Sequence, residues 1–354
     1  MKIETSFSKI IISTDIRSVI TKLIDDSDYS KIFILVDENT HEHCLPVLQN
    51  TNFLNDTLII ETKSGESNKT VDTLKQIWEF LTLHDADRHS LFINLGGGII
   101  GDMGGFAAST FKRGIDFVNI PTTLLSQVDA SVGGKTGINF LNYKNEIGVF
   151  NHPQYVFIDS HFLKTLDKRN ILSGWAEMIK HTLIFNQQDF EYLTQHKIQN
   201  INYKTLNQLI ARSVQIKNHY VETDPLEKGQ RKALNFGHTF GHAFESFFMG
   251  QKNYLMHGEA VALGMICEIY LSNKLCGFPT SKMTRVVQYI LDTYPKTNIP
   301  DAATEKIIQL IGHDKKNEGT HINFTLLEDF GKIKINQRCS KDDMMETLTW
   351  YNAL

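Results

Sequence analysis

The chain of 354 residues contains few cysteines, no long basic run and no long apolar run. Its four cysteines, Cys44, Cys267, Cys276 and Cys339, are scattered and form no CxxC pair. This spacing argues against a disulfide framework or a thiolate zinc site, and it favours free thiols in a reducing compartment. We therefore expect a cytoplasmic protein.

Charge and hydropathy exclude two further classes of protein. The net charge is −4, and Lys and Arg do not cluster into the surface that nucleic-acid binding needs. No apolar stretch approaches the roughly 20 residues that span a bilayer, so we expect no membrane partner. The opening segment MKIETSFSKIIIST mixes charged with apolar residues and lacks a small-residue cleavage site, so we expect no secretory signal.

Strand and helix patterns alternate in the first half of the chain. Short apolar runs predict buried strands at 31–37, 56–62, 90–96 and 116–122. Helical stretches lie between them, including 70–84 and the segment after Gly101. This alternation predicts βαβ units and a largely parallel sheet, whose ligands bind beyond the carboxyl ends of the strands.

The pattern changes from about residue 160 onward, where amphipathic helical segments replace the strands. Helices are predicted at 173–186, 205–222, 232–249, 257–276 and 280–294, and one short strand at 321–327. The sequence therefore predicts an α/β domain over residues 1–158 and a mostly α-helical domain over residues 159–354.

A glycine-rich turn is the strongest local signal in the first half. Gly96, Gly98 and Gly101 fit GxGxxG, directly after the strand at 90–96 and at the start of a helical segment. Glycine lets the backbone approach a pyrophosphate, and the helix N-terminus offers free N–H groups. We interpret the motif as a dinucleotide site, with a tight glycine-rich turn as the alternative.

Two other strand ends carry polar residues that suit the same ligand. Asp37 and Asn39 follow the strand at 31–37, and Ser64–Lys69 follows the next strand. Each segment alone is interpreted as an ordinary turn and helix cap. Together, as loops at one edge of one sheet, they support a nucleotide site.

The segment 120–139 has little apolar periodicity. Gly133 and Gly134 stand beside Lys135, and such a backbone nest suits a phosphate or the surroundings of a nicotinamide ring. A solvated loop is an equal alternative.

The second half contains the residue types of a metal site. His238 and His242 are four residues apart and share a helix face, and His257 opens the next helix. Together with Glu177 on an earlier helix, two of these histidines provide the three protein ligands of a catalytic metal. A lone HxxxH is more often structural, and spacing alone neither chooses among the histidines nor excludes two other carboxylates, Glu245 and Glu259.

Basic residues gather around these helices in the sequence. A solvated face is the default interpretation of each, although a phosphorylated, carboxylated substrate needs several cations near the metal. The residues are Lys180, Lys217, Arg231, Lys315 and Lys316.

Five blocks of the sequence closely resemble the signature blocks of the 3-dehydroquinate synthases, in that family's order and spacing. They are GGGIIGDMGGFAA, RGIDFVNIPTTLLSQVDASVGGKTGIN, SGWAEMIKH, LNFGHTFGHAFE and HGEAVALGM. The resemblance implies a Rossmann-like, NAD-binding N-terminal domain and a helical C-terminal domain that binds metal and substrate.

The resemblance also implies a role for individual residues. It implies zinc or cobalt on Glu177, His238 and His257. It implies NAD contacts from Asp37, Asn39, Glu66, Lys69, Gly97, Gly98, Asp102, Thr122, Thr123, Asp129, Lys144, Phe162 and Thr165. It implies substrate contacts from Lys135, Asn145, Lys180, Lys217, Arg231, Asn235, His242 and either Lys315 or Lys316.

The implied activity is conversion of 3-deoxy-arabino-heptulosonate 7-phosphate to 3-dehydroquinate and phosphate, a step of the shikimate pathway of aromatic amino acid biosynthesis. Such an enzyme is a carbon–oxygen lyase that uses NAD without consuming it. Lys135 and His242 are expected to handle phosphate and protons, and Arg231 and Asn235 the carboxylate. Arg113 resembles a residue that enters the neighbouring subunit's site, so a homodimer is expected.

Three alternatives accompany this interpretation. The chain could be another sugar-phosphate cyclase, of the 2-deoxy-scyllo-inosose or valiolone type. It could be a metal-dependent NAD polyol dehydrogenase, which would consume NAD. It could also be a non-catalytic NAD-binding regulator, which would not need Glu177, His238 and His257.

Overall fold

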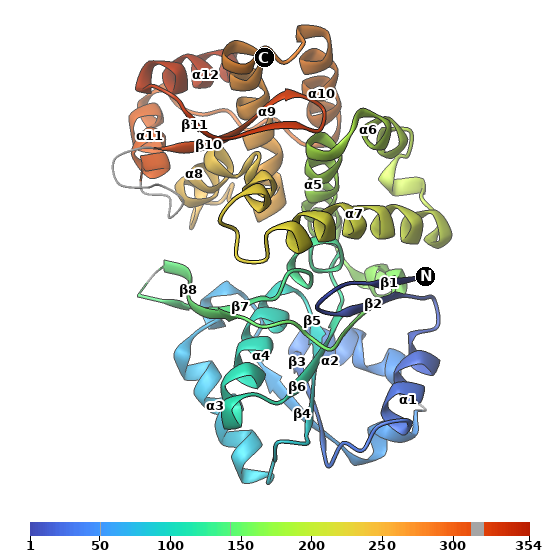
Figure 1. Cartoon of the computed structure of the whole chain (residues 1–354). Helices are drawn as coiled ribbons and strands as arrows, with labels where there is room; N and C mark the ends of the chain where they lie inside the picture. Colours follow the sequence, from blue (N-terminus) through green and yellow to red (C-terminus); the bar gives the residue numbers. More distant parts are fainter. Residues whose placement is uncertain (50, 142, 313–321) are drawn as a thin grey trace. The chain divides into compact units, whose positions relative to one another are not determined.

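The computed structural model describes residues 1–49, 51–141, 143–312 and 322–354 (Figure 1). The chain folds into two compact units, the first formed by Met1–Asp167 and Asn202–Asn218, the second by Lys168–Ile201 and His219–Leu354. The predicted division after residue 158 differs from this grouping. Residues 159–167 and Asn202–Asn218 belong to the first unit. The chain therefore enters the second unit at Lys168, returns to the first at Asn202 and leaves it again at His219.

The first unit is built on a parallel sheet. Within the described residues the sheet has seven strands in the order β1-β2-β9-β6-β5-β3-β4. They are β1 (Lys2–Glu4), β2 (Lys9–Ile12), β3 (Ile32–Asp37), β4 (Thr57–Thr62), β5 (Leu91–Gly96), β6 (Asp116–Pro121) and β9 (Tyr155–Ile158). Among the described strand pairs of this sheet, only β1–β2 is antiparallel. The predicted strands are confirmed as β3, β4, β5 and β6, whereas β1, β2 and β9 are not among the predicted strands.

Helices cover both faces of this sheet. They are α1 (Ile16–Asp25), α2 (Glu38–His43), α3 (Val71–Leu83) and α4 (Gly98–Thr110). Side chains of β3 alternate between the faces: Ile34 and Val36 pack in one core cluster with α1, and Phe33 and Leu35 pack in the other with α3 and α4. Burial on both faces explains why these strands are continuous apolar runs and not alternating ones.

Short elements follow the carboxyl ends of the strands. The segment 120–139, with its glycine nest, is more regular than a loop: it holds the end of β6, a π-helical turn at Ser126–Ala130 and strand β7 (Lys135–Phe140). β7 pairs antiparallel with β8 (Tyr143–Phe150) in a separate hairpin. A 3₁₀ helix, Ser160–Thr165, follows β9.

The second unit is mostly helical, as predicted. Its helices are α5 (Lys168–Phe185), α6 (Gln187–Thr194), the end of α7 (Tyr203–Thr223), α8 (His238–Phe248), α9 (His257–Cys276), α10 (Thr280–Thr293), α11 (Thr304–Gly312) and α12 (Lys341–Ala353). The predicted short strand corresponds to β10 (Asn323–Asp329), which pairs with β11 (Lys332–Arg338). α8 begins six residues later than predicted, because Gly237 has a left-handed backbone (φ 81°) after a 3₁₀ helix at Gln230–Asn235.

Helix α9 forms the centre of the second unit (Figure 1). It packs against α5, α8, α10, α12 and β10, and its residues are buried on all sides from Gly258 to Ile269. A helix that is apolar all round is buried in this way. Nevertheless, no helix in the described part of the chain is long and apolar enough to cross a membrane.

Glycines bring α8 and α9 into close backbone contact. A Cβ at Gly264 would lie 2.1 Å from the carbonyl oxygen of Gly237 and 2.6 Å from the nitrogen of Gly241. A Cβ at Gly241 would lie 3.1 Å from the Cα of Val261. Residues further along α8 therefore meet residues nearer the start of α9, so the two helices are antiparallel and fixed in register.

We predict that Gly264→Ala lowers the free energy of unfolding by about 1–3 kcal/mol, because the new methyl group can only be accommodated by separating the two backbones. Urea unfolding followed by circular dichroism measures the change. Gly312→Ala is the matched control: a Cβ there meets nothing within 4 Å, so the change should stay below about 1 kcal/mol. Equal effects of the two substitutions would contradict the close α8–α9 packing.

Candidate metal and nucleotide sites

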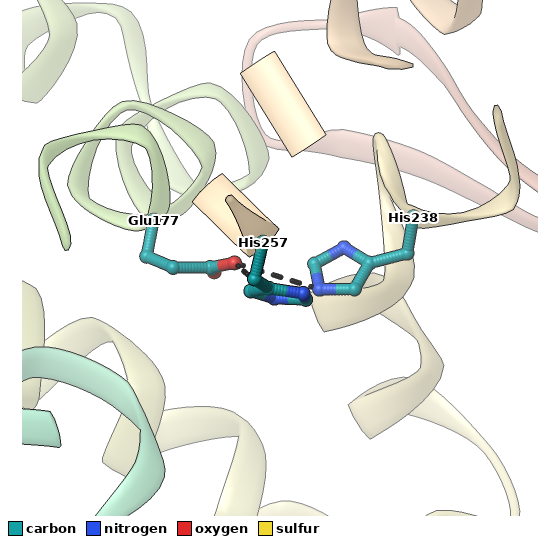
Figure 2. Close-up of side chains that lie close together, drawn as sticks. All are labelled: Glu177, His238 and His257. Atoms are coloured by element: carbon teal, nitrogen blue, oxygen red, sulfur yellow. Dashed lines mark ion pairs between the residues drawn. The ribbon is translucent and has the colours of Figure 1, made fainter. Parts of the chain in front are cut away.

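Three ligand-type side chains from three helices of the second unit converge. Glu177 on α5, His238 on α8 and His257 on α9 have ligand atoms that all lie within 4.8 Å of one another. Oε1 of Glu177 is 3.5 Å from Nε2 of His238 and 3.4 Å from Nε2 of His257, and Figure 2 shows the three side chains pointing toward one another. One carboxylate and two imidazoles form the donor set of a catalytic zinc-type site, which leaves further positions open for substrate oxygens.

His238 is held through the backbone of its own helix turn. It is the first residue of α8, and the N-cap residue before it, Gly237, has no side chain to satisfy the free N–H groups of the helix. The buried carboxylate of Glu268, on α9, accepts hydrogen bonds from the N–H groups of Gly237 (2.6 Å), Thr239 (2.9 Å) and Phe240 (3.2 Å). Glu268, which is not among the residues predicted from the sequence, thereby fixes the backbone from which His238 projects.

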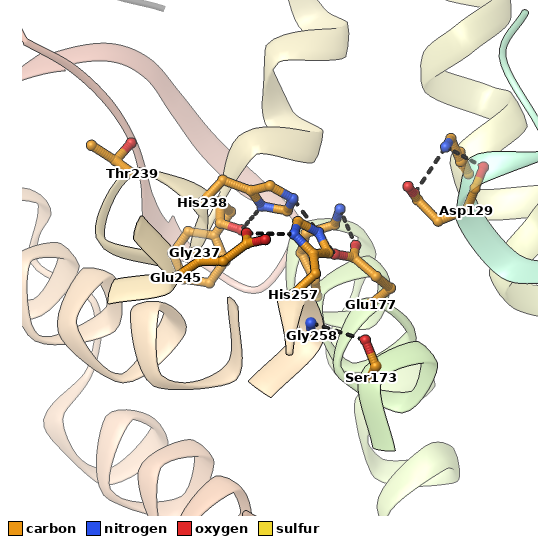
Figure 3. Close-up of polar contacts among 12 residues, drawn as sticks. Asp129, Ser173, Glu177, Gly237, His238, Thr239, Glu245, His257 and Gly258 are labelled. Carbon is orange, nitrogen blue, oxygen red and sulfur yellow. Dashed lines mark hydrogen bonds and ion pairs between the residues drawn. The ribbon is translucent and has the colours of Figure 1, made fainter. Parts of the chain in front are cut away.

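His257 begins α9, and this helix end is tied to α5. Arg169 makes a two-pronged ion pair with Glu259, with Nε–Oε1 at 2.8 Å and Nη2–Oε2 at 2.6 Å. The N–H of Gly258 donates to Oγ of Ser173 at 3.0 Å (Figure 3). A Cβ at Gly258 would lie 2.0 Å from the carbonyl oxygen of Ser173, so this contact requires glycine. Glu259, an open alternative for the metal ligand, therefore serves the α5–α9 contact.

The protonation of His257 reflects its neighbours. Burial lowers the pKa of the imidazole, but hydrogen bonds to Glu177 and Glu245 outweigh burial and raise this pKa to about 9. A histidine with a raised pKa keeps its proton at neutral pH. A metal cation must displace that proton, so cation binding strengthens as pH rises.

The other predicted residues of the second unit lie on the same elements. Lys180, one turn after Glu177, forms an ion pair with it, and both side chains are buried. The ring of His242 lies 5.3 Å from the ring of His238 and 6.0 Å from that of His257, centroid to centroid, so it adjoins the three converging residues without belonging to them.

The predicted carboxylate-binding pair lies on the 3₁₀ helix that precedes α8. Nη1 of Arg231 donates to the carbonyl oxygen of Pro225 at 2.7 Å, and the side chain is buried. Nδ2 of Asn235 donates to Oε1 of Glu227 at 3.0 Å. Glu227, the partner of Asn235, has a left-handed backbone (φ 57°). The sequence patterns did not identify Glu227 as a site residue. Lys315 and Lys316 lie outside the described residues.

In the first unit, the predicted nucleotide-binding residues gather at one edge of the sheet. Asp37 ends β3, Glu66 follows β4, Gly97 and Gly98 follow β5, and Thr122 follows β6. These strands are parallel, so their carboxyl ends share an edge, where open α/β sheets bind their ligands. Gly97 is the N-cap of α4 and provides no side-chain cap, which leaves the helix N-terminus available to a phosphate.

The remaining predicted residues of this unit have mixed surroundings. Asp37 caps α2 through the N–H of Thr40 (2.8 Å), so its structural role is also met. Phe162 is a core residue, buried in the cluster with α1. The others are Asn39 in α2, Thr123 after β6, Lys135 at the start of β7, Lys144 in β8 and Thr165 in the 3₁₀ helix after β9.

A polar network around the buried ammonium of Lys69 joins several of these residues. Nζ of Lys69 lies 2.5 Å from Oδ2 of Asp102 and also donates to Oδ1 of Asn145. Asn139 accepts from the N–H of Asn145 (2.8 Å) and donates to Oε1 of Glu66 (2.7 Å). Burial raises the pKa of Asp102, and the ammonium of Lys69 opposes that shift. The network brings residues predicted for NAD and for substrate into contact.

Lys217 and Asp129 form a second pair within the first unit. Nζ of Lys217 lies 2.9 Å from Oδ1 of Asp129 and donates to its carbonyl oxygen at 2.5 Å. Residues far apart in sequence, one predicted for NAD and one for substrate, therefore stand side by side.

Arg113 lies in a strained segment. Lys112 (φ 48°), Arg113 (φ 70°) and Gly114 (φ 116°) are consecutive residues with left-handed backbones. Only glycine adopts this region without cost, and other residues pay of order 1–3 kcal/mol each. Such strain is typical of segments that present a side chain for function, and both Lys112 and Arg113 are exposed.

We predict that Lys69→Met lowers the free energy of unfolding at neutral pH by about 1–3 kcal/mol, because it leaves the largely buried Asp102 carboxylate without its partner. The pKa of Asp102 is already raised by burial, so protonation at lower pH should reduce the deficit. Urea unfolding at several pH values measures both effects.

Two variants serve as controls for that experiment. Asp102→Asn added to Lys69→Met removes the unpaired charge and should recover much of the loss. Lys75→Met breaks an exposed pair with Glu79 (3.5 Å) and should cost less than about 0.5 kcal/mol. A pH-independent deficit in Lys69→Met would contradict the role of the buried pair.

Comparison with known proteins matches the chain to one family over two adjacent ranges. The model for the 3-dehydroquinate synthase N-terminal region matches residues 59–173, and the model for the C-terminal region matches residues 174–317. The 3-dehydroquinate synthase of Parabacteroides distasonis is 49% identical over 346 residues, 98% of each chain. That of Campylobacter concisus is 41% identical over 292 residues, 82% of this chain and 83% of the relative.

Solved structures share the fold at lower identity. A 2-deoxy-scyllo-inosose synthase complexed with carbaglucose-6-phosphate, NAD+ and Co2+ has a TM-score of 0.89 at 22% identity, covering 98% of this chain and 99% of that one. A 2-epi-5-epi-valiolone synthase from Streptomyces hygroscopicus with NAD+ and Zn2+ has a TM-score of 0.87 at 23% identity, covering 99% and 98%. An iron-containing alcohol dehydrogenase has a TM-score of 0.69 at 13% identity, covering 99% of both chains. The fold is therefore common to cyclases and dehydrogenases, and fold alone does not choose between them.

Proposed function

The chain belongs to the 3-dehydroquinate synthase family, and we propose that it converts 3-deoxy-arabino-heptulosonate 7-phosphate to 3-dehydroquinate and phosphate. The observation that carries this proposal is the convergence of Glu177, His238 and His257. A non-catalytic NAD-binding protein has no need of such a donor set. Relatives at 40–49% identity bear the same name, which favours this activity over that of the other cyclases.

We further propose that the chain uses one divalent cation, zinc or cobalt, and NAD, as the cyclase structures with NAD+ and Co2+ or Zn2+ suggest. Glu177, His238 and His257 hold the cation, and the loops at the carboxyl edge of the sheet hold the nucleotide. When bound, the cation supplies Lewis acidity to substrate hydroxyls and NAD supplies a hydride acceptor that each turnover regenerates. The enzyme is then a carbon–oxygen lyase without net oxidation.

Charged residues of the chain bind and orient the anionic substrate. Arg231 and Asn235 recognise the carboxylate, since each is held by a hydrogen bond on the element just before the metal-binding helix. Lys135 and His242 handle the phosphate and its proton, and His242 stands next to both histidine ligands. Lys180 forms an ion pair with Glu177 and orients its carboxylate. Holding several groups in register in this way lowers the entropic part of the barrier.

A homodimer and a cytoplasmic location also belong to this proposal. The strained backbone at Arg113 supports a side chain presented to a partner subunit, in whose active site it would lie. The scattered cysteines, two of them buried and two partly buried, support a reducing compartment.

The turnover experiment supplies the heptulosonate phosphate with zinc and a substoichiometric amount of NAD. We expect phosphate and 3-dehydroquinate in equal amounts, many turnovers per NAD, and no accumulation of NADH absorbance, because the hydride is returned within each cycle. Glu177→Gln should abolish both products. NADH formed in step with product would identify a net dehydrogenase, and activity on a hexose phosphate instead would identify another cyclase.

Mixing two inactive variants tests the shared active site. Arg113→Ala removes the residue that a subunit donates, and Glu177→Gln removes a residue that it keeps. After joint unfolding and refolding, hybrid dimers have one intact site, so about a quarter of the wild-type rate should return. Each variant refolded alone should stay inactive. Failure of the mixture, with hybrid dimers demonstrated by tagged chains, would contradict the donated arginine.

A further inference from the structure

The imidazole of His257 is held at both ring nitrogens. Its Nε2 faces Oε1 of Glu177 at 3.4 Å, and its Nδ1 lies 3.2 Å from Oε2 of Glu245. Figure 3 shows Glu245 and Glu177 on opposite sides of the ring. The two carboxylates therefore define the orientation of the ring, one on the metal-facing side and one behind it.

His238 has the same arrangement with a different acceptor. Its Nδ1 lies 3.2 Å from the carbonyl oxygen of Phe236, and its Nε2 faces Glu177 at 3.5 Å. A carbonyl or carboxylate oxygen can only accept, so in the metal-binding state each Nδ1 carries the hydrogen. The lone pair of each imidazole is then on Nε2, where a cation shared with Glu177 needs it.

The position of Glu245 follows from the register of α8 against α9. Gly237, Gly241 and Glu245 recur every four residues on one face of α8, and the first two are the close-contact glycines of that face. Continuing one turn along the antiparallel pair brings Glu245 opposite His257, the first residue of α9. Its side chain is only 16% exposed, so the glycine contacts and the burial together limit where the carboxylate can go.

Glu245 is also separated from the metal-facing atoms. Among the described residues, the group of converging ligand atoms consists of Glu177, His238 and His257. Glu245 is not part of this group. Its contact is to Nδ1 of His257, the nitrogen that points away from Glu177. This geometry distinguishes it from a fourth ligand, which is the role that the spacing of the sequence leaves open.

We infer that Glu245 is a positioning residue of the metal site, which orients His257 and fixes its tautomer so that Nε2 binds the cation. The inference rests on the proposed metal-dependent function and adds a residue to it. Backing of a ligand histidine by a carboxylate raises its basicity as a ligand, and loss of such a partner costs roughly 10- to 100-fold in metal affinity.

The test measures Zn2+ affinity of the metal-stripped protein by competition with a chromophoric chelator. Glu245→Gln keeps the size of the side chain but removes its charge, and we expect affinity to fall roughly 10- to 100-fold. Glu245→Asp keeps the charge and should lose less affinity than Glu245→Gln. Both variants should bind one ion per chain, and saturating zinc should restore most of the turnover that is lost at limiting zinc.

The visible absorption of the Co2+-loaded protein separates positioning from ligation. Removal of a ligand changes the coordination number and therefore the intensity of the Co2+ bands, whereas removal of a positioning residue leaves the band intensities of the saturated protein close to those of wild type. A changed coordination number in Glu245→Gln would overturn the inference, as would a Zn2+ affinity equal to that of wild type.

A matched variant controls for loss of a hydrogen-bonded carboxylate. Glu346 on α12 accepts from Tyr270 (2.7 Å) and pairs with Lys274 (2.7 Å) at the surface, so Glu346→Gln should leave Zn2+ affinity unchanged. Circular dichroism of the metal-free forms confirms that each variant is folded. Wild type that binds no Zn2+ would contradict the proposed function itself, whereas equal binding by wild type and Glu245→Gln would contradict only the role of Glu245.

Discussion

A carboxylate with no exposed surface is the constraint on which the second unit depends. Glu177 is 0% exposed, and an ionised carboxyl in such surroundings is stable only beside compensating positive charge. Lys180 provides a cation from the same helix, and two imidazoles converge from α8 and α9. In the proposed function, a divalent cation would add to this positive charge around Glu177, so the carboxylate that the fold buries is also the one that the metal would bind.

Both histidines of the proposed metal site are the first residues of their helices, so metal binding there would depend on how the helix starts are capped. The N–H groups at a helix start lack partners within the helix. Glu268 supplies them for α8, and Glu259 accepts from the N–H of Met256 just before α9. Acidic groups at helix N-termini are also favoured by the helix dipole. The same carboxylates that stabilise the helix ends thus fix the direction in which His238 and His257 project.

In the first unit, polar groups gather near a sheet whose strands are buried. Its central strands are mostly apolar on both faces, and the buried Asn94 of β5 and Asn119 of β6 pair with each other at 2.8 Å. Outside the sheet, Lys69, Asp102 and Asn145 satisfy one another. Such a network is stable while its members are paired, and a ligand bound there as proposed would replace some partners with its own polar atoms. This explains how residues of one edge can be both structural and available for binding.

The sequence by itself determined which segments form helices and which form strands, and which types of residue are available for a metal site and a nucleotide site. Continuous apolar runs predicted β3, β4, β5 and β6, and helical periodicity predicted α5, α7, α8, α9 and α10, because burial of apolar surface imposes these patterns locally. The short strands β1, β2 and β9 carry too few residues for such a pattern. The glycine turn and the residue types of the metal site were also visible as motifs, and the family resemblance chose three ligands among the candidates.

Tertiary structure alone decided which side chains face one another. The pairing of Glu245 with His257, of Glu268 with the start of α8, and of Arg169 with Glu259 depends on the register of separate helices. Close backbone contacts at Gly258 and Gly264 set that register. A linear sequence records the residues but not the distances between helices, and hydrogen bonds and metal coordination depend on those distances.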